Sequence, residues 1–319
     1  MDAHAARAAA PADAAAPLPV RPSSGRRAAV GATAPWKEAV IGGVRLAYDD
    51  EGHGPAIVCL HAIGHGARDF APLRARLRDR YRIIAPDWPG HGSSEADHRP
   101  VSAARYASLL AGLLDAVAVE RCVLVGNSIG GTAAVRHAEA HPERVRGLVL
   151  ENPGGLAATD DALACAVLGG MVRFFRAGTR RRSWFPRAFA AYYRLCVLQR
   201  AAAAAQRRRI VACAYEIAPV LEQAWRHFGE PDYDVRSLAP RIHCPVLFAW
   251  ATRDQFVQLR RSRAAIRQFP NVRLEVFRAA HAAHLETPDA FAGALEGFLA
   301  ELAPGGRAEP MVARAGARR

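Results

Sequence analysis

Short apolar runs alternate with longer amphipathic runs along residues 36–302. The apolar runs have the length of buried strands and include PAIVCLHA, YRIIAPD, RCVLVGN, VRGLVLE, CPVLFAW and VRLEVF. The amphipathic runs predict helices over 101–117, 129–141, 257–268 and 288–302. An earlier pair of runs around Gly42 and Gly43 predicts a hairpin. Strands that alternate with helices predict an α/β fold, with a mostly parallel, doubly wound sheet covered by helices on both faces.

The strand signal disappears between residues 156 and 237, and this stretch is interpreted as several helices inserted into the α/β body. It contains arginine triplets at 180–182 and 207–209, together with five aromatic residues: Trp184, Phe185, Tyr192, Tyr193 and Trp225. Such an insertion is either a packing subdomain or a lid over a pocket. We favour a lid, because the insertion follows the carboxyl end of a strand, where open α/β sheets bind ligands.

The same pattern divides the chain into domains. Residues 35–155 and 238–303 are expected to form the α/β core, and residues 156–237 the helical lid. The first 34 residues are rich in Ala, Pro and Arg and lack an unbroken apolar stretch. We expect residues 1–34 and 304–319 to be disordered.

Composition narrows the range of partners. Hydrophobic residues make up 51% of the 319 positions, which is enough for a large core. The net charge is +13, but the arginines are scattered and lack the aromatic interleaving of nucleic-acid sites, so no nucleic-acid partner is expected. No run approaches the ~20 apolar residues of a membrane span, so no membrane partner is expected. The six cysteines have no metal-ligand spacing, which favours a reducing, cytoplasmic location and argues against a metal site.

Ser128 lies between Gly126 and Gly130 in LVGNSIGG, where a strand-like run stops and a helix-like run begins. A tight strand-to-helix turn forces its central residue into an unfavourable backbone conformation, so the residues two positions away must be very small. The turn lifts the hydroxyl clear of the sheet and aims the amide groups of the helix N-terminus at it. Ser128 is therefore the candidate nucleophile.

A serine nucleophile needs a base to take its proton and an acid to orient that base. The candidate base is His281, just beyond the run 272–277, with His284 as its rival. The candidate acid is Asp254, in the loop after the run 246–250. Its alternative role is purely turn-forming, and its rival as acid is Glu151, which we expect to pair with an arginine.

Other polar residues have structural interpretations. His61 is expected to shape its own loop through hydrogen bonds, whereas Asp87 and His91 are expected to lock a turn. His65 carries no usable signal. The glycines around Ser128 do not form a G-x-G-x-x-G run from strand to helix, so no dinucleotide cofactor is expected.

Five stretches resemble the landmarks of the lidded α/β-hydrolases, in order, within about residues 36–302: LHAIGHGARDF, DWPGHGSS, GNSIGG, TRDQFV and AAHAAHLETPDAF. The resemblance implies an eight-stranded sheet. By position, it also implies that the backbone N–H groups of Ile63 and Ile129 form the oxyanion hole. Two residues depart from the family's pattern. Ala62 replaces the commoner glycine of the oxyanion loop, and Ala280 replaces the glycine that often precedes the catalytic histidine.

The predicted function is that of a serine hydrolase, which acts on an ester, thioester or lactone through an acyl-enzyme and needs no cofactor. Dehalogenases and epoxide hydrolases of this family carry an aspartate at the strand-to-helix turn, so Ser128 at that position argues against both activities. LVGNSIGG, ENPGGL and FPNVRLEVF also resemble hydrolases that cleave carbon–carbon bonds of ring-fission dienones. A non-catalytic, ligand-binding member of the fold is a third alternative. The expected partner is a small-molecule substrate, with an anionic one suggested by the arginine triplets, and the sequence leaves a homo-oligomer open.

Overall fold

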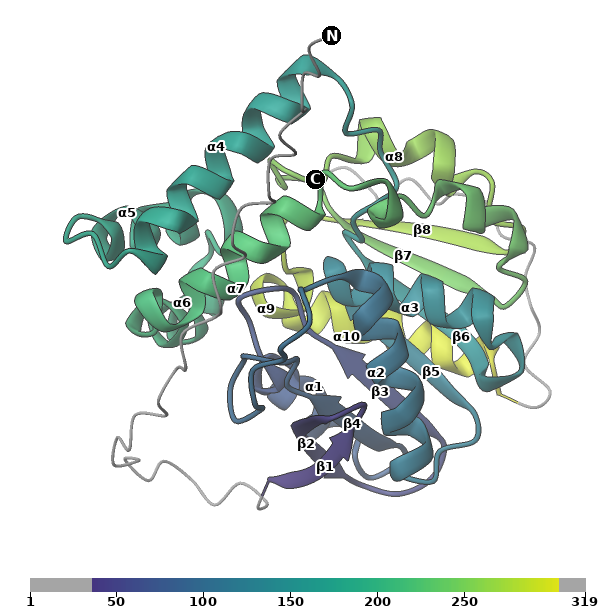
Figure 1. Cartoon of the computed structure of the whole chain (residues 1–319). Helices are drawn as coiled ribbons and strands as arrows, with labels where there is room; N and C mark the ends of the chain where they lie inside the picture. The colour runs from purple at the N-terminus through teal and green to yellow at the C-terminus, as the bar shows by residue number, and fades with distance from the viewer. Residues whose placement is uncertain (1–35, 304–319) are drawn as a thin grey trace, which may run out of the picture. The chain divides into compact units, whose positions relative to one another are not determined.

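Eight strands form one sheet in the computed structural model, which describes residues 36–303 (Figure 1). The strand bounds are β1 Lys37–Ile41, β2 Val44–Glu51, β3 Ala56–Leu60, β4 Arg82–Pro86, β5 Cys122–Asn127, β6 Val145–Glu151, β7 Val246–Ala251 and β8 Val272–Phe277. Their order in the sheet is β1-β2-β4-β3-β5-β6-β7-β8. The β1–β2 and β2–β4 pairs are antiparallel, and all other pairs are parallel. The predicted fold class is confirmed.

The predicted hairpin at the start of the sheet is also present. Gly42 and Gly43 join β1 to β2 with φ values of +54° and +83°. Residues with a side chain rarely adopt such positive φ values. The expected disorder of residues 1–34 and 304–319 falls outside the described residues.

Each central strand contributes to two separate cores, because successive side chains of a strand point to opposite faces. In β3, Val58 and Leu60 belong to one hydrophobic cluster, whereas Ile57 and Cys59 belong to the other. The first cluster includes residues of α2 (Ala103–Ala116), α3 (Ile129–Ala140) and α8 (Leu259–Ile266). The second includes residues of α1 (Ala71–Leu77) and α10 (Pro288–Glu301). Helices therefore cover both faces of the sheet, as predicted.

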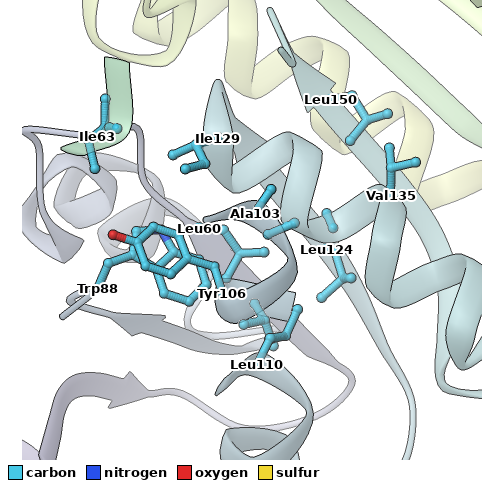
Figure 2. Close-up of a cluster of buried hydrophobic side chains, with 14 of the residues drawn as sticks. Leu60, Ile63, Trp88, Ala103, Tyr106, Leu110, Leu124, Ile129, Val135 and Leu150 are labelled. Carbon is cyan, nitrogen blue, oxygen red and sulfur yellow. The ribbon is translucent and has the colours of Figure 1, made fainter. Parts of the chain in front are cut away.

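Figure 2 shows how the first core is filled. Leucine side chains from three neighbouring strands meet side chains from two covering helices, and the residues labelled in that view include Leu60, Leu124, Leu150, Ala103, Leu110 and Val135. Beside Leu60, the rings of Trp88 and Tyr106 stack with centroids 4.4 Å apart. This packing makes a rigid base for the loops at the carboxyl ends of the strands.

Helices fill the chain between β6 and β7. They include α4 (Ala162–Thr179), α5 (Phe185–Tyr192), α6 (Ala204–Ala212) and α7 (Ala214–His227), and Figure 1 shows them gathered together in teal and green. No strand occurs within residues 156–237. Buried aromatic rings hold the helices together, since Phe175, Phe185 and Phe189 pack on one another and Phe175 also stacks on Trp225.

By length and composition alone, α4 is the one helix among residues 36–303 that could cross a membrane. Alanine and larger apolar residues dominate it, and only Arg173 and Arg176 carry charge. In this fold α4 packs along α7 and exposes Leu163 and Val167 near its N-terminus.

The remaining helix, α9 (Ala283–Glu286), is short and lies in the loop between β8 and α10. It ends the segment that carries His281 and His284. The chain after β5, β6, β7 and β8 thus delivers all of the polar residues singled out as nucleophile, acids and bases to one edge of the sheet.

Candidate active site

Ser128 occupies a strained turn between β5 and α3. Its φ of +54° and ψ of −123° are unusual for a residue with a side chain and cost about 1–3 kcal/mol. The Ser128 N–H donates to the carbonyl oxygen of Glu151 at 2.9 Å, which fixes the turn to the end of β6. The packing around the turn holds this conformation, and Ser128 itself is buried.

The glycines on either side of Ser128 are sterically required. A Cβ atom on Gly130 would lie 2.3 Å from the carbonyl oxygen of Leu60, and one on Gly126 would lie 2.6 Å from the Cα of Gly131. Both contacts are with backbone atoms, which cannot move aside as a flexible side chain can. The close approach of α3 to β3 and β5 therefore depends on these glycines.

Asp254 and His281 form a hydrogen-bonded pair, with Nδ1 of the histidine 2.6 Å from Oδ2 of the aspartate. The other carboxylate oxygen, Oδ1, accepts the N–H groups of Phe256 and Val257 at 2.9 and 3.0 Å. Asp254 therefore forms a turn and also orients a histidine, so its two predicted roles are compatible. Its side chain is fully buried, whereas that of His281 is 13% exposed.

Two asparagines that the sequence analysis missed hold this pair in place. Asn152, with φ of +40°, donates from Nδ2 to Oδ2 of Asp254 at 2.8 Å and accepts the Ala251 N–H at 2.7 Å. Asn127 donates to the carbonyl oxygen of His281 at 3.0 Å. A sequence signal exists in each case, because Asn127 ends one buried strand run and Asn152 directly follows another.

The rival residues, Glu151 and His284, pair with each other. His284 donates to Glu151 from its backbone N–H at 3.0 Å, and its Nδ1 lies 2.5 Å from Oε2. The expectation that Glu151 pairs with an arginine is wrong, because β6 ends opposite the segment that leads into α10 and both side chains are buried there. His284 also stacks on Phe70 with centroids 4.8 Å apart. Neither rival lines the cavity that contains Ser128.

Two buried histidines shape the oxyanion loop, residues 61–66. Burial lowers the pKa of His61 to about 4 and that of His91 to about 3, so both rings are neutral at pH 7. In His61, Nε2 accepts the Trp88 N–H at 2.8 Å, which leaves Nδ1 to donate to the Ala62 carbonyl at 2.7 Å. In His91, Nε2 accepts the Gly64 N–H at 2.9 Å. The predicted loop-shaping role of His61 is confirmed.

Asp87 locks the neighbouring turn, as predicted. Its carboxylate accepts the N–H groups of Ala67 at 2.8 Å and Ser93 at 3.0 Å, which ties the oxyanion loop to the loop after β4. His91 completes the turn through a contact from Nδ1 to the carbonyl of Pro89 at 3.0 Å.

The oxyanion loop presents a free amide group at Ile63. Within residues 36–303, neither the Ile63 N–H nor the Ile129 N–H has a hydrogen-bond acceptor, and Ile129 is the first residue of α3. Figure 2 shows the two residues on the same side of the core, one on the loop and one on the helix. Ala62 fits this loop because the residue with positive φ is Gly64, at +77°, and not Ala62.

A cavity of about 230 Å³ brings these parts together. Its lining includes Ser128, His281 and Ile63 from the loops at the sheet edge. The opposite wall comes from the helical insertion and is mainly apolar, with Leu168, Tyr192, Tyr193, Leu221 and Trp225. Within the described residues, no arginine of the triplets 180–182 and 207–209 lines the cavity, and Arg261 is the one guanidinium that does.

The charge state of His281 follows from its surroundings. Burial by itself lowers the pKa of His281, but nearby carboxylates outweigh this effect, and Asp254 is the strongest of them. Glu151 and Glu286 act in the same direction. The pKa of His281 is therefore raised above the ordinary value of 6.5.

No grouping of three or more His, Cys, Asp or Glu side chains within residues 36–303 is arranged to hold a metal ion. The polar groups that the site brings together are a serine, a histidine–carboxylate pair and two amide groups. The profile of the alpha/beta hydrolase family matches residues 57–294. The chain belongs to this family. The predicted membership is confirmed, and the predicted hydrolase class is confirmed at the level of the family.

The curated relatives of this α/β-hydrolase match it over only part of their length. A 2-hydroxy-6-oxo-6-phenylhexa-2,4-dienoate hydrolase of Burkholderia cepacia is 36% identical over 126 residues, which are 36% of this chain and 42% of that protein. The α/β-hydrolase spans 34% of the length of an uncharacterized protein of Mycobacterium tuberculosis and 44% of that of a 2-hydroxymuconate semialdehyde hydrolase of Pseudomonas sp. (strain CF600).

Solved structures show the same fold over most of this α/β-hydrolase. A thermophilic esterase from Thermogutta terrifontis is 23% identical, with a TM-score of 0.72 over 84% of this chain and 99% of that chain. An enol-lactonase from Burkholderia xenovorans LB400 is also 23% identical, with a TM-score of 0.68 over 82% of this chain and 99% of that chain. At these identities the similarity concerns the fold.

Proposed function

We propose that this α/β-hydrolase is a serine hydrolase that cleaves an ester, thioester or lactone of a small molecule through an acyl-enzyme at Ser128. One observation carries the proposal. Ser128, His281 and Ile63 line a single cavity, and Asp254 holds His281 by a hydrogen bond on its outer side. This is the set of groups that acyl transfer requires.

In the proposed reaction, Nε2 of His281 takes the proton from Oγ of Ser128 while Oγ attacks the carbonyl carbon. The oxyanion of the tetrahedral intermediate accepts the N–H groups of Ile63 and Ile129. His281 then gives its proton to the leaving oxygen or sulfur atom, and the carbon–oxygen or carbon–sulfur bond breaks. Water attacks the acyl-enzyme by the same steps, with His281 again as base. Asp254 stays ionised and keeps the proton of the neutral imidazole on Nδ1.

We also propose that residues 156–237 act as a lid on a core formed by residues 35–155 and 238–303. The insertion supplies most of the apolar cavity wall, and it contacts the histidine loop through the Val197 carbonyl, which accepts the His281 N–H at 3.1 Å. The cavity of about 230 Å³ is smaller than the roughly 300–1,000 Å³ of typical ligand pockets. A compact, largely apolar acyl group therefore fits this site best.

A panel of short, long and cyclic esters, assayed beside a ring-fission dienone, tests the substrate class. We expect the short esters and the lactones to be hydrolysed with the highest kcat/KM, because the cavity is small and apolar. The dienone represents the second candidate function, which the partial identity to a dienoate hydrolase favours. Turnover of the dienone with no turnover of any ester or lactone would replace the first proposal with the second.

We also propose that the substrate carries a carboxylate, which Arg261 at the cavity wall would bind. The arginine triplets lie away from the cavity lining, and Arg261 also pairs with Asp161. The panel therefore includes a neutral ester and its carboxylated analogue at low and high salt. A preference for the anion that salt weakens would support an anionic substrate.

A cytoplasmic location also remains a proposal. All six cysteines are free, which suits a reducing compartment. Cys59 and Cys122 are buried in strands. Cys165 and Cys213 are exposed, so an oxidising compartment would expose their thiols to oxidation.

The raised pKa of His281 predicts the pH dependence of the reaction. Only the neutral imidazole can take the serine proton, so activity rises as pH increases through the pKa of His281. Because that pKa lies above 6.5, the acidic limb of kcat/KM should have its midpoint above 6.5. In Glu286→Gln, which removes one carboxylate that raises the pKa, the midpoint should move to lower pH. A pH profile of both proteins with a neutral ester measures this, and a wild-type midpoint at or below 6.5 would contradict it.

A further inference from the structure

We propose that His65 is a specificity-determining residue whose Nε2 binds a hydrogen-bond donor of the substrate, a hydroxyl or amide N–H group near the scissile carbonyl. This inference rests on the proposed function of the same cavity. The sequence analysis found no signal at this residue.

His65 lies in the oxyanion loop, two residues after Ile63. It is among the residues that line the same cavity as Ser128 and His281. Tyr193 of the helical insertion packs against its ring, with centroids 5.8 Å apart. His65 therefore belongs to the wall of the cavity in which the proposed reaction takes place.

Asp69 fixes one side of the His65 ring. Nδ1 of His65 lies 2.5 Å from Oδ2 of Asp69, and both side chains are 1% exposed. The second carboxylate oxygen, Oδ1, accepts a hydrogen bond from Gln206 of α6. Arg209 in turn donates from Nε to Oε1 of Gln206 at 2.8 Å. The lid thus holds Asp69, and Asp69 holds His65.

The other ring nitrogen, Nε2, is buried and has no hydrogen-bond partner within residues 36–303. In the neutral ring, Nδ1 donates to the Asp69 carboxylate, and Nε2 is then an acceptor.

An acceptor of this kind selects its ligand. A substrate hydroxyl or N–H group can donate a hydrogen bond to Nε2. A carbonyl oxygen at the same place is itself an acceptor, so it cannot form this hydrogen bond and is repelled by the Nε2 lone pair. Sites that hydrogen-bond a substrate group reject analogues that lack it far more strongly than apolar pockets reject a change of size. His281 already serves as the base of the proposed reaction, so this second histidine is available for recognition.

The test uses methyl butyrate, methyl 3-hydroxybutyrate and methyl acetoacetate, with the matching 2-hydroxy and 2-oxo esters of butyric acid. Hydroxy and oxo esters of one pair have nearly the same size but opposite hydrogen-bonding character. Hydrolysis is followed by titration of the released acid. In the wild type we expect one hydroxy ester to exceed its oxo partner by roughly tenfold in kcat/KM, as one hydrogen bond provides. In His65→Phe this ratio should fall by about the same factor.

Asp69→Asn provides a second variant with a different expected result. Gln206 donates to Oδ1, so the amide oxygen of the new asparagine stays toward Gln206 and its NH₂ group turns toward Nδ1 of His65. The imidazole proton then moves to Nε2, which becomes a donor. We expect the preference to shift toward the oxo ester. A purely structural role of Asp69 would lower the activity on both esters alike. Asp79→Asn, at an exposed aspartate, serves as the matched control and should leave the ratio unchanged.

The ratio within each protein cancels general losses of activity, so a change in the ratio reports on recognition. The same hydroxy-to-oxo ratio in wild type, His65→Phe and Asp69→Asn would overturn the proposal. If no methyl ester is hydrolysed, the proposed function fails, and the recognition site is tested separately. Calorimetry then compares binding of methyl 3-hydroxybutyrate and methyl acetoacetate to Ser128→Ala with and without His65→Phe. Equal binding of the two esters to Ser128→Ala would overturn the site itself.

Discussion

Replacing Ser128 by alanine is expected to lower kcat by on the order of 10⁶-fold, as the loss of the nucleophile does in known serine hydrolases. The variant keeps the Cβ atom and removes only Oγ, so the turn between β5 and α3 retains its contacts. The hydrogen bonds that hold the turn come from backbone atoms, including the Ser128 N–H to Glu151. The remaining activity would come from the oxyanion donors and from binding alone.

Hydrolysis of p-nitrophenyl acetate and labelling by a fluorophosphonate probe measure this loss. The probe should label the wild type at Ser128 and should not label Ser128→Ala. Ser108→Ala, at an exposed position of α2, is the matched control and should keep both properties. Equal hydrolysis by wild type and Ser128→Ala would refute the nucleophile assignment and would favour the ligand-binding alternative.

The second large effect is expected for Asp254→Asn, which should lower kcat by roughly 10⁴-fold. The N–H groups of Phe256 and Val257 require an acceptor, so the asparagine oxygen should stay on that side. The NH₂ group then faces Nδ1 of His281, which loses its acceptor. The imidazole proton moves to Nε2, and a protonated Nε2 cannot take the proton of Ser128.

Glu151→Gln separates the two candidate acids. Glu151 pairs with His284 and not with His281, so its loss should reduce stability while kcat falls far less than in Asp254→Asn. Thermal unfolding and kcat are measured on both variants. If Glu151→Gln lost as much activity as Asp254→Asn while still folded, Asp254 would not be the orienting acid that we propose.

Much of the fold could be predicted from the sequence because the controlling patterns are local. The alternation of apolar runs in β3 reflects the two faces of a strand, and the two cores use alternate residues of that run. The nucleophile turn was predicted for a similar reason. Gly126 and Gly130 stand two positions either side of Ser128, a spacing that can be read from the chain, although the backbone that Gly130 approaches belongs to Leu60 of β3.

The sequence was less informative where function depends on partners that are distant in the chain. It suggested an arginine for Glu151, but the actual partner, His284, lies 133 positions away. It assigned no role to Asn152, which meets Asp254 102 positions later, or to His65, whose Asp69 is held by Gln206. The arginine triplets suggested an anionic substrate, but none of them lines the cavity.

The sequence by itself therefore determined the succession of strands and helices along the chain, the strained serine turn and the residue types of a hydrolase site. Only the tertiary structure decided which carboxylate meets which histidine, which helix faces cover the cavity and which buried nitrogen remains without a partner. The physical reason is that hydrophobic period and turn sterics act between residues close in the chain. Hydrogen-bond partners at the sheet edge depend instead on strand order and register, and on how the inserted helices pack over the loops.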